Sequence, residues 1–428
     1  MHIDYDVVIA GGGMVGSTLA CALGNTALRV AVLEPLPASP PPEQGYDLRV
    51  SAITLATRAI FEAVGAWSAM QERRLAPIRE MRVWDAAGAG SIHFDSADIG
   101  QPELGYIIEN SVIVQALHRR MQDFSNIRYL CPMALQGVER DVGGVPQAAR
   151  GAQGKRAQPP QQRPSHVALT TRTGERLSAR VLVGADGAQS LVRRLAGIRS
   201  RGWEFNQKGI VATVKTSQPH RQTAWQRFLP TGPLAMLPLD DEYCCSIVWS
   251  ADTARADQLL ALEDRDFIAE LQEAFGDALG LVETVGPRAA FPLALAHAEG
   301  YVQPGVALVG DAAHRVHPLA GQGVNLGFAD AAALAEVLLE AHGAHKDISQ
   351  YAVLRRYERW RKFDNAAMLA VTDGLKRLYG TRHAGIVYLR DLGMNLTDST
   401  QPLKNKIMRL AAGLDGDLPR LARGVRRF

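Results

Sequence analysis

One stretch near the N-terminus constrains the fold of this 428-residue chain more than any other. Residues 5–10 (YDVVIA) form a short apolar run typical of a buried strand, and the pattern G-x-G-x-x-G follows at Gly11, Gly13 and Gly16. An apolar helical stretch and a second strand, which ends at Glu34, complete the unit. A strand, a glycine turn, a helix and a parallel second strand predict a doubly wound α/β fold.

Each residue type in this unit has a physical task in binding a dinucleotide. Gly11 allows the tight turn, Gly13 lets the backbone approach a diphosphate, and Gly16 lets the helix pack against the strand. The N-terminus of the helix presents unpaired N–H groups and a positive dipole end to the phosphates. Glu34 is a candidate acceptor for ribose hydroxyls and would repel a 2′-phosphate. The pattern predicts a bound dinucleotide and does not distinguish FAD from NAD.

The strand-and-turn pattern occurs twice more along the chain. Residues 181–184 lead to Asp186, and residues 305–309 lead to Asp311. An aspartate placed like Asp186 is often only a helix N-cap, and this interpretation stays open beside a ligand role. Asp311 is followed by a loop and a long helical pattern, so residues 310–331 are a candidate site for a polar, partly anionic ring system. The loop contains Pro318, Gly321 and Gly323.

Long excursions separate the three units. Their short runs of alternating polar and apolar residues indicate strands of a second sheet. We therefore expect two interleaved domains that meet in a cleft, where ligands usually bind. The predicted parts are a nucleotide-binding domain (1–75, 106–200 and 290–345), a mixed-sheet substrate domain (76–105 and 201–289) and a C-terminal helical region (346–428). Residues 142–165 lack large apolar side chains almost entirely, which predicts a flexible insertion.

Composition excludes several classes of function. A net charge of +3 is too weak for a nucleic-acid binder, which concentrates basic residues on one face. The four cysteines lack zinc or redox spacing, so we expect no metal site and buried thiols in a reducing compartment. The N-terminus lacks the basic start of a signal peptide, and no run reaches the about eighteen apolar residues of a membrane span. The chain is therefore predicted to be cytoplasmic, and at most peripheral at the inner membrane.

Taken together, the three motifs resemble the signature of the single-component FAD-dependent aromatic hydroxylases. The residues that carry the likeness are the first glycine pattern with Glu34, GADG at 184–187, and GDAAH at 310–314 with its continuation HPLAGQGVNLG. Within this family the chain looks most like the polyprenylphenol hydroxylases of ubiquinone biosynthesis, and among these like the enzymes that oxidise ring carbon 5. The segments similar to that branch are LRVSAI (48–53), CSIVWS (245–250) and QYAVLRRYERWRK (350–362).

The resemblance implies a fold and a set of flavin contacts. The nucleotide-binding domain would be an FAD-binding, Rossmann-like domain of the glutathione-reductase type. Asp311 would accept hydrogen bonds from the ribityl chain, Asp186 would line the diphosphate, and Arg49 and Gln115 would contact the flavin or its phosphates. The helix after the third motif would direct its positive end at the reduced ring. The implied residues around the ring are Pro318, Gly321, Gln322, Gly323 and Asn325.

The implied reaction is hydroxylation of the aromatic ring of a polyprenylphenol by NAD(P)H and O2, through a hydroperoxide at flavin C4a. NAD(P)H would be a transient co-substrate, because the chain has only one complete nucleotide fingerprint. No side-chain acid or base is assigned, and His314 and His317 are interpreted as structural. Three alternatives stay open: a hydroxylase acting at another ring position, an isoprenoid-saturating FAD reductase of the same fold, and a non-catalytic flavoprotein that serves as an assembly partner.

A polyprenyl substrate requires an apolar passage, and a membrane lipid requires access to a surface. Residues of the second sheet are candidates for the passage and equally for the core: Trp225, Phe228, Leu234, Met236 and Leu237. Residues 404–428 carry seven basic and two acidic side chains, a net charge of +5. This tail is interpreted either as a contact to an anionic membrane or a ubiquinone-biosynthesis complex, or as a solvated helix face.

Overall fold

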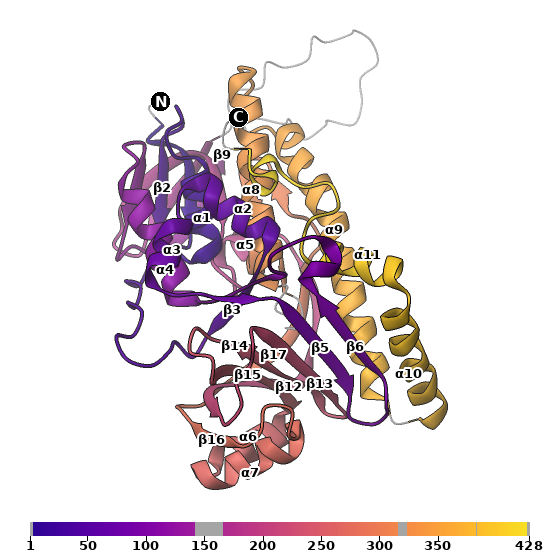
Figure 1. The fold of residues 1–428 in the computed structure, drawn as a ribbon. Helices are drawn as coiled ribbons and strands as arrows, with labels where there is room; N and C mark the ends of the chain where they lie inside the picture. Colours follow the sequence, from indigo (N-terminus) through magenta and orange to yellow (C-terminus); the bar gives the residue numbers. More distant parts are fainter. Residues whose placement is uncertain (1–2, 142–165, 316–322, 382, 426–428) are drawn as a thin grey trace.

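The computed structural model describes residues 3–141, 166–315, 323–381 and 383–425 (Figure 1). The predicted insertion at 142–165 lies outside the described residues. So do residues 317–322 of the third motif, which include His317, Pro318, Gly321 and Gln322.

The first large sheet has eight strands, and its path runs β18-β19-β11-β1-β2-β8. Its parallel strands are β1 (Tyr5–Ala10), β2 (Val30–Leu33), β8 (Ile127–Leu130), β11 (Arg176–Gly184) and β19 (Val306–Leu308). The antiparallel strands are β9 (Leu135–Asp141), β10 (His166–Thr171) and β18 (Val302–Gln303). Strand β2 is buried over its whole length and β1 over all but its first residue because helices cover them, which explains their continuous apolar runs.

Three helices pack closely around the first glycine turn: α1 (Met14–Ala22), α4 (Asn110–Gln122) and α8 (Gly323–Gly343). Small residues permit this approach. A Cβ added to Gly327 of α8 would lie 2.7 Å from a methyl carbon of Val15 on α1. Such a separation is below van der Waals contact, so α1 and α8 pack this closely only because Gly327 has no side chain.

A small sheet and two helices follow the second strand of the nucleotide unit. The sheet contains β3 (Val50–Thr54), β4 (Ala76–Ile78) and β7 (Gly105–Glu109), and the helices are α2 (Leu55–Val64) and α3 (Trp67–Arg73). The sequence places Arg49 directly before a helix, but β3 stands between them. The alternating VSAIT pairs with β7, and the Thr54 hydroxyl then caps α2 by accepting the N–H of Thr57.

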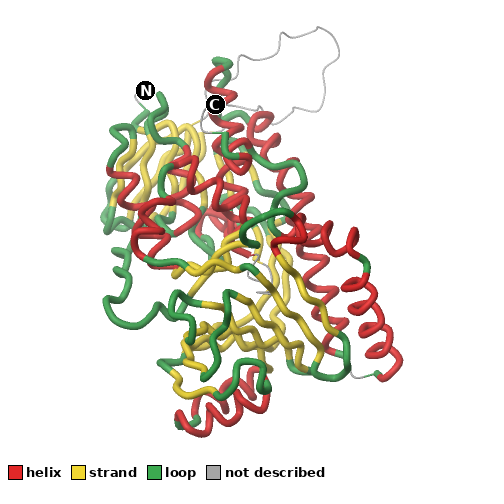
Figure 2. Tube along the Cα trace, in the orientation of Figure 1, coloured by secondary structure: helices red, strands yellow, loops and turns green. Residues whose placement is uncertain are grey.

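The second large sheet has nine strands, and its path runs β20-β17-β12-β15-β14-β13-β5-β6, with β16 paired to β12. Helices α6 (Thr253–Ala261) and α7 (Asp264–Phe275) cover one of its faces (Figures 1 and 2). The strands are β5 (Glu80–Asp85), β6 (Ser91–Asp95), β12 (Ser200–Thr216), β13 (Thr223–Leu229), β14 (Gly232–Pro238), β15 (Cys244–Asp252), β16 (Val282–Val285), β17 (Ala289–Ala298) and β20 (His314–Arg315).

The sequence predicts that the nucleotide-binding domain resumes at residue 290, but the strand pairing assigns residues 290–298 to the second sheet. Strand β17 pairs with β12 from Ser200 to Val211, so residues 289–298 belong to the nine-stranded sheet and not to the nucleotide-binding part. The physical reason is that β12 extends from Ser200 to Thr216, and its residues up to Val211 find their backbone hydrogen-bond partners on β17.

Three helices form the C-terminal region: α9 (Tyr351–Gly380), α10 (Ala384–Ser399) and α11 (Gln401–Ala411). In Figure 1, α9 runs from beside the first sheet down to the nine-stranded sheet, with α10 and α11 outside it. On α10, Asp391, Asn395 and Asp398 accept the backbone N–H groups of Ala89, Ser91 and His93. The helix thereby covers the unpaired edge of β6. Among the described residues, no helix is long and apolar enough to cross a membrane.

Candidate active site

The three sequence motifs meet at one edge of the eight-stranded sheet. Ala10 pairs with Gly184, and Gly184 pairs with Leu308. These are the last residues of three neighbouring parallel strands, so the glycine turn, the GADG segment and the GDAAH segment all begin at the same carboxyl edge. Ligands of open α/β sheets bind outside this edge.

The glycine turn has room for a diphosphate at one position and no room for side chains at two others. A Cβ on Gly13 would meet no atom within 4 Å, and Gly13 precedes α1 without a side-chain cap. A Cβ on Gly11 would lie 2.3 Å from the oxygen of Ala185, and one on Gly16 would lie 2.0 Å from that of Gly11. The first-turn N–H groups of α1 lack partners within the helix and stand next to the open space at Gly13. This cradle fits the diphosphate of FAD.

Glu34 lies half-buried beside the same turn. Its Oε2 accepts the N–H of Gly12 at 2.7 Å, and its Oε1 accepts that of Leu36 at 3.2 Å. Because each carboxylate oxygen has two lone pairs, both oxygens can also accept a ribose hydroxyl. His118 of α4 supports the turn from the other side, since its Nε2 donates to the oxygen of Gly12 at 2.8 Å. Nothing in the sequence pattern identifies this contact.

Asp186 acts as a helix cap in the structure. Its carboxylate accepts the hydroxyl of Ser190 at 2.5 Å and the backbone N–H groups of Leu191 and Val192 at 2.7 and 3.0 Å. This is the interpretation that the sequence alone leaves open. The side chain is only half-buried, and a role beside the diphosphate stays a prediction.

Arg193 joins the second motif to the third. Its guanidinium donates to the oxygen of Ala312 at 2.7 Å and to that of Ala188 at 2.8 Å. Burial lowers the pKa of Arg193 from its ordinary value. An arginine in a short helix after GADG has no signal in the sequence that would assign it this task.

Asp311 presents an exposed carboxylate at the carboxyl end of β19. Within the part of the chain that the structure describes, this carboxylate has no hydrogen-bond or ion-pair partner. The preceding Gly310 has φ of +59° and lies against Val15, so the turn into Asp311 is closely packed. An unpaired carboxylate on a closely packed turn suits the binding of ribityl hydroxyls.

Of the ring-side residues, Gly323 and Asn325 are described. Gly323 begins α8, while Asn325 is buried. The amide of Asn325 donates to the oxygen of Ala52 at 2.7 Å and accepts from Thr57 and the N–H of Thr54 at 2.8 and 3.1 Å. Its side chain therefore ties α8 to β3 and α2, whereas the sequence predicts a contact to the cofactor.

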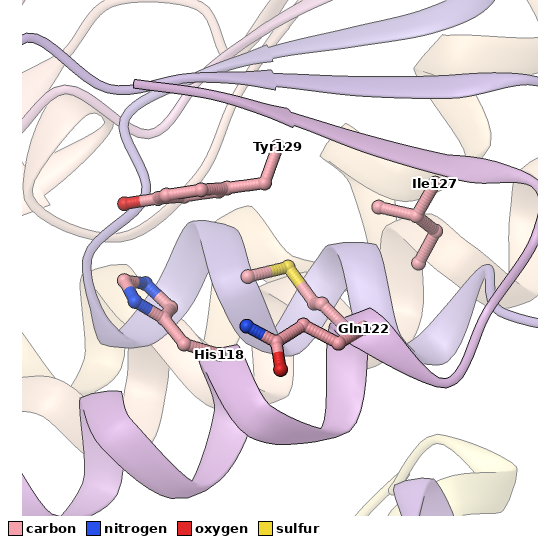
Figure 3. A pocket seen from close by; sticks show the side chains of 5 residues that line it. His118, Gln122, Ile127 and Tyr129 are labelled. Carbon is pink, nitrogen blue, oxygen red and sulfur yellow. The ribbon is translucent and has the colours of Figure 1, made fainter. Parts of the chain in front are cut away.

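Arg49 and Gln115 are exposed residues that lie outside the three motifs, Arg49 directly before β3 and Gln115 on α4. The guanidinium carbon of Arg49 stands 5.0 Å from the ring centre of Phe291 on β17, so Arg49 joins the small sheet to the nine-stranded sheet. Gln115 lines a surface cavity of about 370 Å³ along α4. A neighbouring cavity of about 130 Å³ lies between α4 and β8, beside His118 and Tyr129 (Figure 3). The smaller cavity is below the size of cofactor sites.

The passage candidates of the nine-stranded sheet divide between its two faces. Leu234 and Met236 are fully buried against α6 and α7, and Trp225 packs on the same cluster. Phe228 faces the other way and stacks on Tyr379 of α9 at 3.7 Å between ring centres. Leu237 also lies off the α7 face and is half-buried. The core interpretation therefore holds for Leu234 and Met236, because alternate residues of a strand point to opposite faces.

The face away from α7 carries half-buried apolar side chains on neighbouring strands. Val211 pairs with Val248, which pairs with Ala235, and all three are only partly covered. Phe291, with Arg49 above it, lies at one side of this row. The row is therefore a candidate apolar surface for a substrate.

Comparison with known proteins agrees with this geometry. A family model described as an FAD binding domain matches residues 4–368. The ubiquinone hydroxylase UbiL of Rhodospirillum rubrum is 38% identical, over 98% of this chain and 93% of that protein. The mitochondrial ubiquinone biosynthesis monooxygenase COQ6 of Xenopus tropicalis is 37% identical, over 95% and 93%. The 3-demethoxyubiquinol 3-hydroxylase of Escherichia coli is 35% identical, over 96% and 98%.

A solved structure supports the fold independently. The p-nitrophenol 4-monooxygenase PnpA of Pseudomonas putida superposes with a TM-score of 0.74 over 97% of this chain, at 18% identity. At that identity the likeness concerns the fold alone. With the family match over most of the chain and the relatives at 35–38% identity, the chain belongs to the FAD-dependent monooxygenases, with FAD as its cofactor, in the branch that contains the ubiquinone-biosynthesis hydroxylases.

Proposed function

We propose that this chain hydroxylates the aromatic ring of a polyprenylphenol in ubiquinone biosynthesis, with NAD(P)H and O2 as co-substrates. The observation that carries the proposal is the likeness to ubiquinone-biosynthesis hydroxylases over nearly the full length of the chain. The convergence of three motifs at one sheet edge supports it. NAD(P)H is proposed to bind transiently, because the sequence holds a single complete glycine fingerprint.

The residues of this chain hold and orient FAD, which supplies the activation of O2 that side chains cannot. We assign the diphosphate to Gly13 and the first turn of α1, the ribose to Glu34 and the ribityl chain to Asp311. The positive end of α8 at Gly323 favours negative charge on the adjacent ring. No lysine is needed for that purpose.

The remaining assignments concern residues near the ring and the phosphates. Asp186 is proposed to lie beside the diphosphate, and Arg49 and Gln115 are proposed to contact the flavin or its phosphates. Residues 316–322, which include Pro318, Gly321 and Gln322, are proposed to line the reactive edge of the ring, where the phenol and O2 meet. The half-buried row around Val211 and Val248 would hold the phenol and exclude water from it.

Ring carbon 5 is the position that we propose, and the test is direct. A short-chain prenylphenol is incubated with the protein, NAD(P)H and air, and the product is analysed by mass spectrometry and NMR. We expect a mass gain of one oxygen and loss of the proton at carbon 5. A product oxygenated at another carbon would place the chain with a different hydroxylase of the pathway. Saturation of a prenyl double bond would instead identify a reductase, and FAD binding without any turnover would identify an assembly partner.

The basic tail gives little free charge for a membrane contact. Most of its described cations are in ion pairs: Lys404 with Asp98 and Asp398, Lys406 and Arg409 with Asp415, Arg420 with Glu336 and Glu340, and Arg423 with Asp417. A contact that depended on these side chains alone would have to break the pairs. The solvated-face interpretation therefore fits the tail better than direct anion binding.

A different surface of the C-terminal helices suits a lipid contact. Exposed apolar side chains gather on α10 and α11: Ile386, Tyr388, Leu389, Leu392, Leu396, Leu403, Ile407 and Leu410. On α10 the only charged side chains are Arg390, which is buried, and Asp391 and Asp398, which hold the edge of β6. The outer face of α10 is therefore apolar and uncharged. Monomeric proteins seldom leave such surface in water.

Charge distribution favours an anionic lipid surface as the occupant of this face. Residues 351–428 hold sixteen Lys and Arg against seven Asp and Glu, a net charge of +9, whereas residues 1–350 have a net charge of −6. Part of this excess is neutralised, because Arg356, Arg390, Lys404 and Arg420 pair with carboxylates of residues 1–350. Apolar side chains within a positively charged region fit the boundary of an anionic bilayer. We therefore propose that the chain takes its substrate from a membrane while the α10 face rests on the lipid.

Liposome binding tests this assignment. A triple variant, with Leu389→Ser, Leu392→Ser and Leu396→Ser combined, is compared with a double control variant, with Leu36→Ser and Leu281→Ser combined. The two control positions are 71% and 66% exposed, against 65%, 52% and 59% for the three α10 positions, so each control leucine is at least as exposed as each leucine of the α10 set. We expect the α10 variant to lose about tenfold or more of its binding to anionic vesicles, and the control to bind like the wild type. Equal binding by both variants would contradict the lipid assignment and favour a protein partner.

A further inference from the structure

One carboxylate within α8 is completely buried and accepts four hydrogen bonds. Asp330 Oδ2 accepts the N–H of Gly310 at 3.2 Å and Nε2 of His314 at 2.5 Å. Asp330 Oδ1 accepts Nε of Arg361 at 2.9 Å and the amide of Asn365 at 3.1 Å. Asp330 is 0% exposed, and its four partners come from two parts of the chain, residues 310–314 and helix α9. Such a cluster costs desolvation free energy, so its retention calls for a specific task.

Two of the partners belong to segments that are assigned to the flavin: Gly310 to the turn before Asp311, and His314 to the strand before residues 316–322. Gly310 directly precedes Asp311, and its φ of +59° lies in the left-handed region that glycine adopts readily. His314 lies on β20, which pairs with β17 of the nine-stranded sheet. The chain then enters residues 316–322. One carboxylate therefore fixes both the turn that presents Asp311 and the start of the segment assigned to the ring.

The other two partners belong to α9. Beyond Arg361 and Asn365 the same helix continues to the nine-stranded sheet, where Leu369 packs with Leu295 and Tyr379 stacks on Phe228. Helix α9 is thus anchored at the flavin side by Asp330 and at the substrate side by its apolar contacts. The anchored helix sets the position of the substrate sheet relative to the flavin segments.

The Asp330 carboxylate is ionised within this cluster. Burial opposes ionisation of Asp330, but His314 and Arg361 outweigh it, and the pKa of Asp330 is held below its ordinary value. The carboxylate thus keeps its charge at neutral pH, and a charged acceptor holds its donors more firmly than a neutral one.

We propose that Asp330 is a positioning residue for catalysis: it holds the turn before Asp311 and the strand before residues 316–322 in register, and through Arg361 it couples them to α9 and the substrate sheet. The proposal rests on the flavin role of Asp311 given above. It predicts that loss of the carboxylate weakens FAD binding and separates flavin oxidation from ring hydroxylation.

Three variants test it: Asp330→Asn, Glu358→Gln, and the double variant Asp330→Asn with Arg361→Gln. Glu358 is the matched control, because it is 5% exposed, lies on α9 and accepts the N–H of Tyr301, but among the described residues it contacts neither Gly310 nor His314 through a hydrogen bond. In the double variant no buried arginine is left without a counter-charge, so thermal stability should recover in part. The dissociation constant of FAD is measured on the apoprotein well below the melting temperature. The peroxide released per NAD(P)H consumed is measured on the FAD-loaded protein.

For Asp330→Asn we expect the FAD dissociation constant to rise about tenfold or more, with most reducing equivalents released as peroxide. For Glu358→Gln we expect a change within about twofold. The double variant should regain stability and keep the weakened FAD binding. If FAD affinity and coupling return to wild-type values together with the melting temperature, Asp330 only stabilises the fold and the proposal is overturned. Because affinity is measured directly, this outcome differs from failure of the proposed hydroxylation, which would leave FAD binding intact.

Discussion

Replacing Asp311 by alanine is expected to raise the dissociation constant of FAD by about 10- to 100-fold, because one or more hydrogen bonds to a charged group, worth about 1.5–3 kcal/mol each, are lost. The carboxylate is exposed and unpaired among the described residues, so its removal breaks no hydrogen bond or ion pair within the described part of the chain. The melting temperature of the apoprotein should therefore stay close to that of the wild type. Titration of the apoprotein with FAD, followed by flavin fluorescence, measures the effect.

The conservative variant Asp311→Asn serves as the control for this prediction. An amide keeps the size of the side chain and one acceptor oxygen, so its FAD affinity should lie between those of the wild type and the alanine variant. If the alanine variant retained FAD and activity at wild-type levels, the role assigned to Asp311 would be wrong.

Alanine at Gly13 is expected to weaken FAD binding without loss of stability, whereas alanine at Gly16 is expected to lower the stability of the fold. A methyl group at Gly13 meets no protein atom, so the apoprotein should keep its stability while the methyl group obstructs the diphosphate. A methyl group at Gly16 would lie 2.0 Å from the oxygen of Gly11. Overpacking of that kind costs about 3 kcal/mol or more and outweighs the about 1 kcal/mol that alanine gains over glycine within a helix.

Thermal unfolding and FAD titration separate these two effects. The Gly13→Ala protein should unfold like the wild type and bind FAD about tenfold or more weakly. The Gly16→Ala protein should unfold at a melting temperature lower by about 6 °C or more. An unchanged FAD affinity in Gly13→Ala would contradict the placement of the diphosphate at the first turn of α1.

The convergence of the three motifs could be predicted because each depends on local pattern. A buried apolar run followed by Gly11, Asp186 or Asp311 predicts a strand and the turn at its carboxyl end. Parallel strands then bring those ends to one edge. The register of Ala10, Gly184 and Leu308 has this arrangement.

The remaining features depend on contacts between distant segments. The membership of β17 follows from the length of β12, and the face on which Leu234 or Phe228 lies follows from pairing that no local pattern specifies. The sequence predicts a flavin contact for Asn325, which stays a prediction, but no local pattern indicates that its amide donates to Ala52 of β3. Asp330 looks like a polar residue in an apolar helix until the structure brings Gly310 and Arg361 to it. Hydrophobic periodicity and short motifs describe neighbouring residues, so they do not identify partners that are distant in the sequence.

The origin of the oxygen in the product tests the central claim most directly. The FAD-loaded protein is supplied with NAD(P)H and a short-chain prenylphenol under isotopically labelled O2 in ordinary water, and the product is analysed by mass spectrometry. We predict one labelled oxygen atom on the aromatic ring of each product molecule, with NAD(P)H oxidised in proportion. A product without the label, or oxidation of NAD(P)H that yields only peroxide at every prenylphenol tested, would contradict the assignment of this chain as a ring hydroxylase.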